Sequence, residues 1–389
     1  MRNCVLRSVL ATITAAGLTV GFAASASAGP DRSGRPEPTP TGTYRATVLL
    51  SGSSLAHDVG ATMQPLTKPD DIISFGSHLF VAFQNGVGSS GEVNNTTGNG
   101  LSTLVEVTRS GDVIRQWDLL GKIDGMGANA ATGQVVATVN EDGNSSLYTV
   151  DPDGPAGSGL THYVYNEDLP HGGGTDAVTF YHGMMLISAS APTSVDGPAV
   201  YEVTLQPPTT MGGSGTAVVS SLFSDTAAAT PADQGAPSTL ALTDPDSNVA
   251  VPGSSPRFGG DFMLDSQGDQ QQVYVRDAGT PSQSLSVLAL DQSVNDTAFA
   301  TAEQGALYAT DSSNDTIDVI TGAFHPGDAF VAATPCDANS ASQDCMANYL
   351  GGLDLFSGAV SPLTVVGAKL KPGGLIFVPG ESKDDHEQG

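Results

Sequence analysis

Short apolar runs alternate with turn-forming residues along most of this 389-residue chain. The runs are rich in Val, Ile, Leu, Thr, Tyr and Phe, and segments such as TRSGD, NEDGN and DSSND separate them. Examples of the runs are YRATVLL (44–50), HLFVAF (78–83), QVVATV (134–139), QVYVR (272–276) and LIFVP (375–379). Runs of this length between turn residues are typical of strands. Because we find no helix-length amphipathic stretch between residues 43 and 380, the pattern predicts an all-β fold.

One longer pattern recurs: a turn, an acidic residue, an apolar run, a second turn and a second apolar run. The copies are PDDIISFGSHLFVAF (69–83), GTDAVTFYHGMMLISAS (174–190), GGDFMLDSQGDQQQVYV (259–275) and VNDTAFATAEQGALYAT (294–310), with an Asn variant at 125–139 and a truncated copy, PGGLIFVP, at 372–379. Recurring groups of short strands predict a β-propeller, with six blades expected and seven as the alternative. Because the last copy is short, we expect N- and C-terminal strands to share one closing blade. A pair of two-sheet sandwiches is the alternative fold.

The chain divides into four parts. Residues 1–28 read as a secretory signal peptide, with Arg2 and Arg7 before an apolar stretch and Ala26-Ser27-Ala28 as the cleavage site. The apolar stretch is shorter than the roughly 20 residues that span a bilayer, so we expect cleavage and secretion to the extracellular space. We predict a Pro-rich flexible spacer at 29–42, the propeller at 43–380 and a polar tail at 381–389.

The charge narrows the choice of partners. The net charge is −27, and removal of residues 1–28 would take away two arginines and no acid, which gives −29. Nucleic acids and anionic membrane surfaces would repel such a chain, so neither is expected as a partner. We expect a monomer whose partner is an extracellular ligand or protein that the sequence does not identify.

Two of the three cysteines remain after cleavage. Cys336 and Cys345 lie in the polar segment CDANSASQDC, without another Cys or a His nearby. In an exported protein this arrangement predicts a disulfide that closes a short loop.

The blade-building stretches GALYATDSSNDTIDVITG (305–322) and NYLGGLDLFSGAVSPL (348–363) resemble those of secreted bacterial six-bladed propellers. The group is that of SMP-30/gluconolactonase, NHL and YWTD proteins, and the resemblance covers roughly residues 65–380. It implies the fold, whereas the activity of such proteins depends on the individual site.

Acidic residues occupy corresponding places in the repeats, at the start of each predicted innermost strand. They are Asp71, Asp176, Asp261 and Asp296, with Asn129 in the second repeat and with Asp70 and Asn295 beside ring members. In a propeller these positions surround the mouth of the channel, where converging oxygen ligands would suit Ca²⁺. The lactonases of the resembling group hold a metal there through a set that includes Glu, and the ring in this chain has no Glu. Asp at a strand start also closes turns by accepting backbone N–H groups, so a structural role stays open.

A single histidine is the candidate general base. His171, in LPHGGGTDA, precedes Asp176 by five residues in a Gly-rich loop. Arg257 and Lys68 precede Asp261 and Asp70, where they would pair with the ring or bind an anionic group.

The sequence leaves three functions open. We expect a secreted binding module that uses the channel mouth or the blade loops, because no hydrolase elbow, zinc motif or phosphate-binding loop is visible. The alternative is a Ca²⁺-dependent lactonase or ester hydrolase with a metal held by the Asp ring. A purely structural extracellular protein is the third reading.

Overall fold

The computed structural model describes residues 39–60, 62–155, 159–170, 174–190, 196–210, 212–233, 235–335 and 346–380. Their regular structure is mainly β, and the 3-10 turns η1 (Gly52–Ser54) and η3 (Gln267–Asp269) lie between strands. Over these ranges, no helix has the length and apolar character that crossing a membrane requires.

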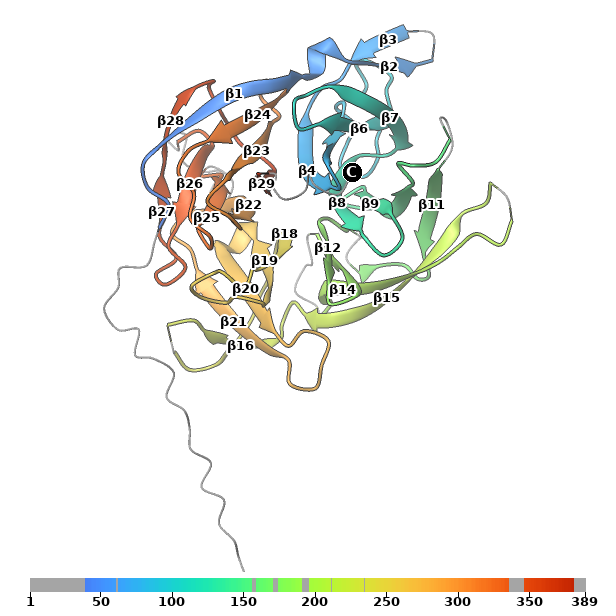
Figure 1. Cartoon of the computed structure of the whole chain (residues 1–389). Coiled ribbons are helices and arrows are strands. Elements are labelled where there is room, and N and C mark those ends of the chain that lie inside the picture. Colours follow the sequence, from blue (N-terminus) through green and yellow to red (C-terminus); the bar gives the residue numbers. More distant parts are fainter. Residues whose placement is uncertain are drawn as a thin grey trace, which may run out of the picture. The chain divides into compact units, whose positions relative to one another are not determined.

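A closed ring of inner strands lies at the centre, and each strand contacts the next around the ring (Figure 1). In ring order the strands are β4 (Pro69–Phe75), β8 (Ile123–Asn129), β12 (Val178–Tyr181), β18 (Pro245–Ala250), β22 (Val294–Phe299) and β29 (Leu375–Pro379). The first five strands follow one another in chain order, and β29 brings the C-terminal part of the described chain back beside β4. The ring therefore encloses a channel whose wall is built from six separate chain segments.

Antiparallel strands continue outward from each inner strand. The second positions are β5 (His78–Phe83), β9 (Gln134–Val139), β13 (Met184–Ser188), β19 (Phe262–Ser266), β25 (Ala329–Ala333) and β23 (Gly305–Asp311). The third positions are β6 (Leu101–Thr108), β10 (Ser146–Val150), β14 (Pro198–Gln206), β20 (Gln271–Arg276), β26 (Tyr349–Leu353) and β24 (Thr316–Thr321). The outer positions are β7 (Val113–Leu120), β11 (Leu160–Tyr165), β15 (Gly215–Ser224), β21 (Ser284–Ala289), β27 (Val360–Pro362) and β1 (Thr43–Ser51).

Shorter strands extend two of the outer edges: β16 (Ala228–Pro231) and β17 (Ser238–Thr239) follow β21, and β28 (Thr364–Gly367) follows β1. Strands β2 (Ala56–Val59) and β3 (Thr62–Pro65) pair with each other in a separate two-stranded sheet. Parallel pairing of β11 with β15 joins two neighbouring groups into one eight-stranded sheet. Radial antiparallel sheets around a channel form a β-propeller, so the predicted fold class is confirmed and the pair of sandwiches is wrong.

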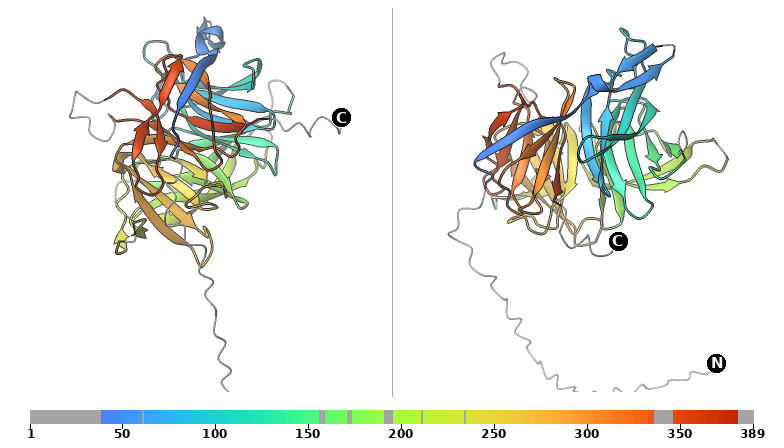
Figure 2. Two further views of the ribbon diagram at one scale, coloured as in Figure 1. Left: turned by 60° about the vertical axis from the view of Figure 1, so that its left-hand side comes forward. Right: turned by 45° about the horizontal axis from the view of Figure 1, so that its top comes forward.

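The first and last strands of the described residues lie in one sheet, as predicted. Strand β1 pairs with β24 from Arg45 opposite Thr321 to Ser51 opposite Thr316, and β23 joins β24 to β29. Figure 2 shows β1, in blue, beside the orange strands from the C-terminal part. The N-terminal strand thus forms the outer part of the sheet whose innermost strand is C-terminal.

Two of the predicted repeats are placed wrongly. Residues 259–275 supply the second and third strands of their sheet, β19 and β20, because β18 precedes them as the inner strand. Residues 294–310 contribute β22 and β23 to different sheets, since β22 pairs with β25. The β23–β24 hairpin lies in a different sheet from β22. It occupies the two positions between β29 and β1, which therefore do not pair directly.

Apolar side chains pack between neighbouring sheets and hold this closure. Tyr44 of β1 is 1% exposed, and its ring centre lies 5.7 Å from that of Phe324 and 5.6 Å from that of Phe330. Phe324 also packs 5.1 Å from Phe377 of β29. Burial of these rings links the first strand of the chain, the last strand and the sheet beside them.

Tyr44→Ala should therefore destabilise the propeller by about 3–5 kcal/mol, the usual cost of removing a buried aromatic ring. Urea unfolding of the chain from Gly29 onward measures the loss. Val48→Ala on the same strand is the control, because Val48 is 48% exposed and exposed substitutions usually change stability by less than about 0.5 kcal/mol. Equal losses in the two variants would show that β1 contributes little to closure.

Candidate functional site

A β-bulge recurs near the start of the inner strands. Two residues of the inner strand face one residue of the second strand, a geometry that bends the strand and re-aims side chains. The bulged pairs are Asp70-Asp71 opposite Ala82, Asp124-Gly125 opposite Thr138, Asp246-Ser247 opposite Asp265 and Asn295-Asp296 opposite Ala332. Before β12, Ser188 likewise hydrogen-bonds to the backbone of both Asp176 and Ala177. Each bulge thus offers two distinct positions for an acidic residue.

The first bulge position points acids and one amide toward a common cavity of about 390 Å³ in the channel. Its residues are Asp70, Asp124, Asp176, Asp246 and Asn295. Glu141 and Lys122 also line the cavity, together with apolar residues that include Ile73, Met126, Val178, Val249, Phe299 and Ile376. The cavity therefore combines a concentration of carboxyl groups with an apolar wall.

Acids at the second bulge position accept hydrogen bonds from backbone N–H groups. Asp71 accepts hydrogen bonds from the N–H of Ile72, at 2.6 Å, and of Met126 on the next inner strand, at 2.5 Å. Asp296 accepts from Thr297 at 2.7 Å and from Leu375 on the next inner strand at 2.6 Å. Both carboxyl groups fasten one inner strand to the next, which is the structural role that the sequence left open.

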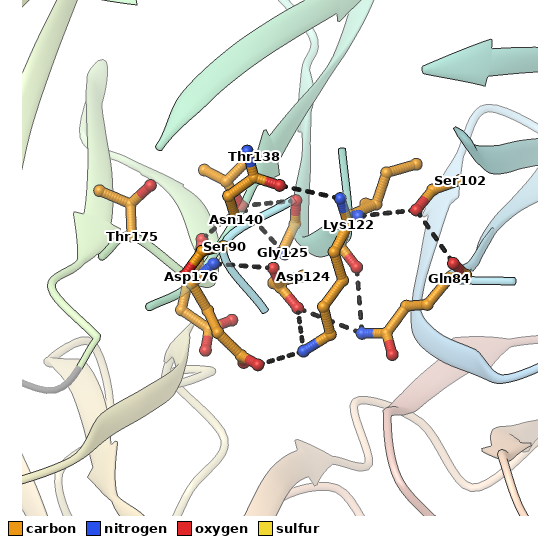
Figure 3. Close-up of polar contacts among 12 residues, drawn as sticks. Gln84, Ser90, Ser102, Lys122, Asp124, Gly125, Thr138, Asn140, Thr175 and Asp176 are labelled. Atoms are coloured by element: carbon orange, nitrogen blue, oxygen red, sulfur yellow. Dashed lines mark hydrogen bonds and ion pairs between the residues drawn. The ribbon is translucent and has the colours of Figure 1, made fainter. Parts of the chain in front are cut away.

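One end of the acid cluster has its own cation. The Nζ atom of Lys122 lies 2.8 Å from Asp124 Oδ1 and also bonds to Glu141. Gln84 Nε2 donates to the same Asp124 oxygen at 3.1 Å (Figure 3). Although burial works against the ammonium charge, Asp124, Glu141 and Asp70 raise the pKa of Lys122, so it stays protonated.

At the other end two carboxyl groups, those of Asp176 and Asp246, are in hydrogen-bond contact, and no basic side chain of the described residues lies between them. Burial raises the pKa of Asp176 to about 8, with contributions from Glu141 and Asp70. Burial also raises the pKa of Asp246 well above its usual range, and the neighbouring Asp176 adds to this shift. A hydrogen bond joins the two carboxyl groups, and because both pKa values are raised, the pair keeps at least one proton at neutral pH.

Other cavity acids resist ionisation for the same reasons. Burial raises the pKa of Asp70 to about 7; Glu141 and Asp296 add to the shift, and Lys122 opposes it. Burial raises the pKa of Asp296 to about 7 although Leu375 N–H opposes the shift. The pKa of Asp71 also rises, through burial and the charges of Asp296 and Asp70. Seven acids around one lysine cannot all ionise without further cations.

Glycine allows the inner strands to approach closely at two of these points. A Cβ atom on Gly125 would lie 2.4 Å from the carbonyl oxygen of Asp176, and one on Gly374 would lie 2.5 Å from that of Asp70. A side chain at either position would separate neighbouring inner strands and widen the cavity.

The predicted metal ring is only partly brought together. Asp71, Asp176, Asn295 and Asp296 line the cavity, with Asp70 beside them. Across the described ranges, no three His, Cys, Asp or Glu side chains converge closely enough to hold a metal ion. Since Asp71 and Asp296 bond to backbone N–H groups, they are poorly placed to act as ligands.

Asn129 and Asp261 lie elsewhere. Asn129 ends β8, and its side-chain oxygen accepts from Ala131 N–H within a turn. Asp261 precedes β19, a second strand, and its Oδ1 lies 3.3 Å from Arg276 Nε. The alignment of the repeats was wrong at these two points, and Asp124 and Asp246 hold the corresponding cavity positions.

The remaining candidates do not enter the cavity or cannot be placed. Arg257 donates to the carbonyl oxygens of Leu355 and Phe356, and Lys68 Nζ donates to that of Ser312. Neither cation therefore pairs with the ring. His171, Cys336 and Cys345 lie outside the described residues, so the predicted general base and disulfide stay predictions.

Sequence reasoning missed Lys122, Asp124, Glu141 and Asp246. Two of them, Asp124 and Asp246, carried a usable signal. The segments IDGM (123–126) and PDSN (245–248) have an acid in their second place, as PDDI (69–72) has Asp70. The DPDSN segment reads as an ordinary turn when taken alone. Lys122 and Glu141 carried no such signal, since pairing of β8 with β9 brings them together.

A scan against protein-family models finds no match, and a search of curated proteins finds none. Among solved structures, the chain is similar to a Bacteroides caccae protein of unknown function (11% identity, 82% of this chain and 90% of the other, TM-score 0.45). It is also similar to a periplasmic gluconolactonase of Pseudomonas aeruginosa (14%, 82% and 90%, 0.43) and to the Cps50 β-propeller domain of Myceliophteria thermophila (9%, 78% and 97%, 0.37). Activity must therefore be argued from this chain's own residues.

The strand-fastening role of Asp71 predicts a clear loss on truncation. Asp71→Ala leaves the N–H groups of Ile72 and Met126 without their acceptor, which should cost about 1–3 kcal/mol in the free energy of unfolding. Asp70→Ala is the matched control in the same bulge, because Asp70 faces the cavity as a like charge among acids. Urea unfolding at pH 8 compares them, and a loss in Asp70→Ala as large as in Asp71→Ala would contradict the division of roles.

The raised pKa values also predict that stability falls with pH. The folded pKa of Asp176 is about 8 and that of Asp70 about 7, against 3.8 as the ordinary value. The folded state therefore binds more protons, so this stabilisation is complete below pH 3.8 and is lost as the pH rises through 7 to 8. Asp176→Asn should make the decline shallower, by at most about 1.4 kcal/mol per pH unit.

Urea unfolding in chelator between pH 4 and pH 9 measures the slope. Asp58→Asn is the control, since Asp58 is exposed on β2. Identical slopes in wild type and Asp176→Asn would show that Asp176 titrates normally in the folded protein.

Proposed function

We propose that this chain is an exported binding module that takes a positively charged ligand in its channel cavity. The observation that carries the proposal is the charge around the cavity. Among the described residues that line it, one is basic, Lys122, and seven are acidic: Asp70, Asp71, Asp124, Asp176, Asp246, Asp296 and Glu141. Carboxylates that are shielded from water must either keep protons or gain cations. A cationic ligand would satisfy several of them at once.

The size and construction of the cavity also support ligand binding. Its volume of about 390 Å³ falls in the range of small-molecule sites, which are commonly apolar with a few placed polar groups. Its wall consists of strands that are paired on their outer side, so the acids are held by a scaffold that exists before the ligand arrives. Such preorganisation favours affinity because little order has to be created on binding.

The Ca²⁺-dependent lactonase or ester hydrolase stays the second candidate. Asp70, Asp176 and Asp246 are the carboxyl groups left to hold an ion once Asp71 and Asp296 bond to the backbone and Asp124 binds Lys122. Calcium needs six to eight oxygen ligands, and the described side chains do not converge in that way. The geometry therefore favours binding of a cation over metal-centred hydrolysis.

Several finer features belong to the same proposal. We assign one blade to each inner strand, six in all, in a propeller over residues 43–380. The apolar segment within residues 1–28 supports export, and the polar segment at 336–345 supports a disulfide between its two cysteines. The negative charge of the chain supports a monomer that nucleic acid does not bind.

Calorimetric titration of the chelator-treated chain from Gly29 onward tests the proposal at pH 8, with calcium chloride, ethylamine hydrochloride and neutral glucose as probes. A cation should bind at one site, and Asp176→Asn should weaken it at least tenfold while Asp58→Asn leaves it unchanged. Equal binding of glucose, or equal loss in both variants, would contradict a cation site in the cavity. One calcium site that depends on Asp176 would reopen the hydrolase.

A further inference from the structure

The Asp176–Asp246 pair is the part of the cavity whose hydrogen bonding is incomplete. Asp176 is only 8% exposed, and its carboxyl group bonds to another acid. Asp246 Oδ2 is buried, and no donor among the described residues reaches it. Two buried acids without a base between them provide acceptors for N–H groups that the described part of the chain does not supply.

Lys122 shows what these acids bind well. Its ammonium group is held by Asp124 at 2.8 Å and by Glu141, on the same cavity wall. An ammonium group has three donors and needs acceptors at about 2.8 Å, whereas calcium needs six to eight oxygens at about 2.3–2.6 Å. The described acids meet the first requirement and not the second.

The apolar wall indicates the rest of the ligand. Val178 follows Asp176 by two residues, Val249 follows Asp246 by three, and both line the cavity together with Ile73 and Phe299. A hydrated metal ion gains nothing from such a surface, but the carbon skeleton of an organic cation would bury apolar area against it.

We propose that the cavity binds a small primary or secondary amine, whose ammonium N–H groups bind Asp176 and Asp246 and whose apolar body packs on the inner strands. This inference rests on the proposed function and names the chemical class of the ligand. The ammonium group replaces the proton that the two acids share, so uptake of the amine releases a proton to solvent.

Other charged groups around the cavity determine how strongly the Asp176–Asp246 pair attracts a cation. Those that act on the pair are Asp70, Lys122, Asp124, Glu141 and Asp244. The carboxyl groups favour a second cation, whereas the positive charge of Lys122 opposes it. Because Lys122 already occupies Asp124 and Glu141, the Asp176–Asp246 pair is the place for one further ammonium group.

Calorimetric titration with 2-phenylethylamine at pH 7.5 tests the inference. Its matched probes are the N,N,N-trimethyl derivative, which keeps the charge without N–H donors, and 2-phenylethanol, which is neutral. The amine should bind at one site, and both analogues should bind at least tenfold more weakly. Titrations in phosphate and in HEPES, whose ionisation enthalpies differ and neither of which is a primary or secondary amine, should show proton release on binding.

Variants separate this site from general attraction to an acidic protein. Asp246→Asn and Asp176→Asn should each weaken the amine at least tenfold, and Asp58→Asn should leave it unchanged. A far-ultraviolet spectrum and urea midpoint for each variant show that the propeller is folded, and either Asn variant alone suffices if the other does not fold.

Each other outcome has a definite meaning. Binding of the trimethyl derivative as tightly as the amine would overturn recognition through N–H groups. Asp246-dependent binding of calcium without binding of the amine would overturn this inference and leave the cation-binding function standing. No binding of any cation would overturn both.

Discussion

Closure of the ring is the constraint on which the site depends. The first and last strands of the described chain cannot form a sheet by themselves, because β29 is the innermost strand and β1 an outer one. The β23–β24 hairpin fills the two places between them, and Tyr44, Phe324 and Phe377 bury the junction. Without this sheet the ring would stay open between β22 and β4, and its acids would face water. Burial of the carboxyl groups is therefore a consequence of how the chain ends meet.

The recurrent bulge turns one short sequence feature into two functions. An acid in the second position bonds to backbone N–H groups of its own strand and the next, as Asp71 and Asp296 do. An acid in the first position faces the cavity, as Asp176 and Asp246 do. A shift of one residue thus changes a strand fastener into a site residue. The architecture places both types side by side, because each bulge presents two consecutive side chains to the centre.

This one-residue difference explains why the fold could be predicted from the sequence but the full set of site residues could not. Alternating runs and turn residues were sufficient for the all-β propeller and for the meeting of YRATVLL with LIFVP. They were insufficient for the register, because a repeat that begins at β19 looks the same as one that begins at an inner strand. Asp261 was consequently assigned to a position that Asp246 holds. Lys122 and Glu141 were invisible for a different reason, since their pairing depends on strands β8 and β9 meeting in space.

The electrostatic cost of the cavity is the strongest argument that it has a use. Structural needs account for Asp71 and Asp296, and Lys122 accounts for Asp124 and Glu141. Neither accounts for Asp176 and Asp246, whose pKa values are raised mainly by burial and whose carboxyl groups bond to each other. Apolar residues of similar size would close the same ring without placing like charges together. A pair of acids that disfavours the empty state at neutral pH gains stability when a cation arrives, and this difference in free energy is what a binding site requires.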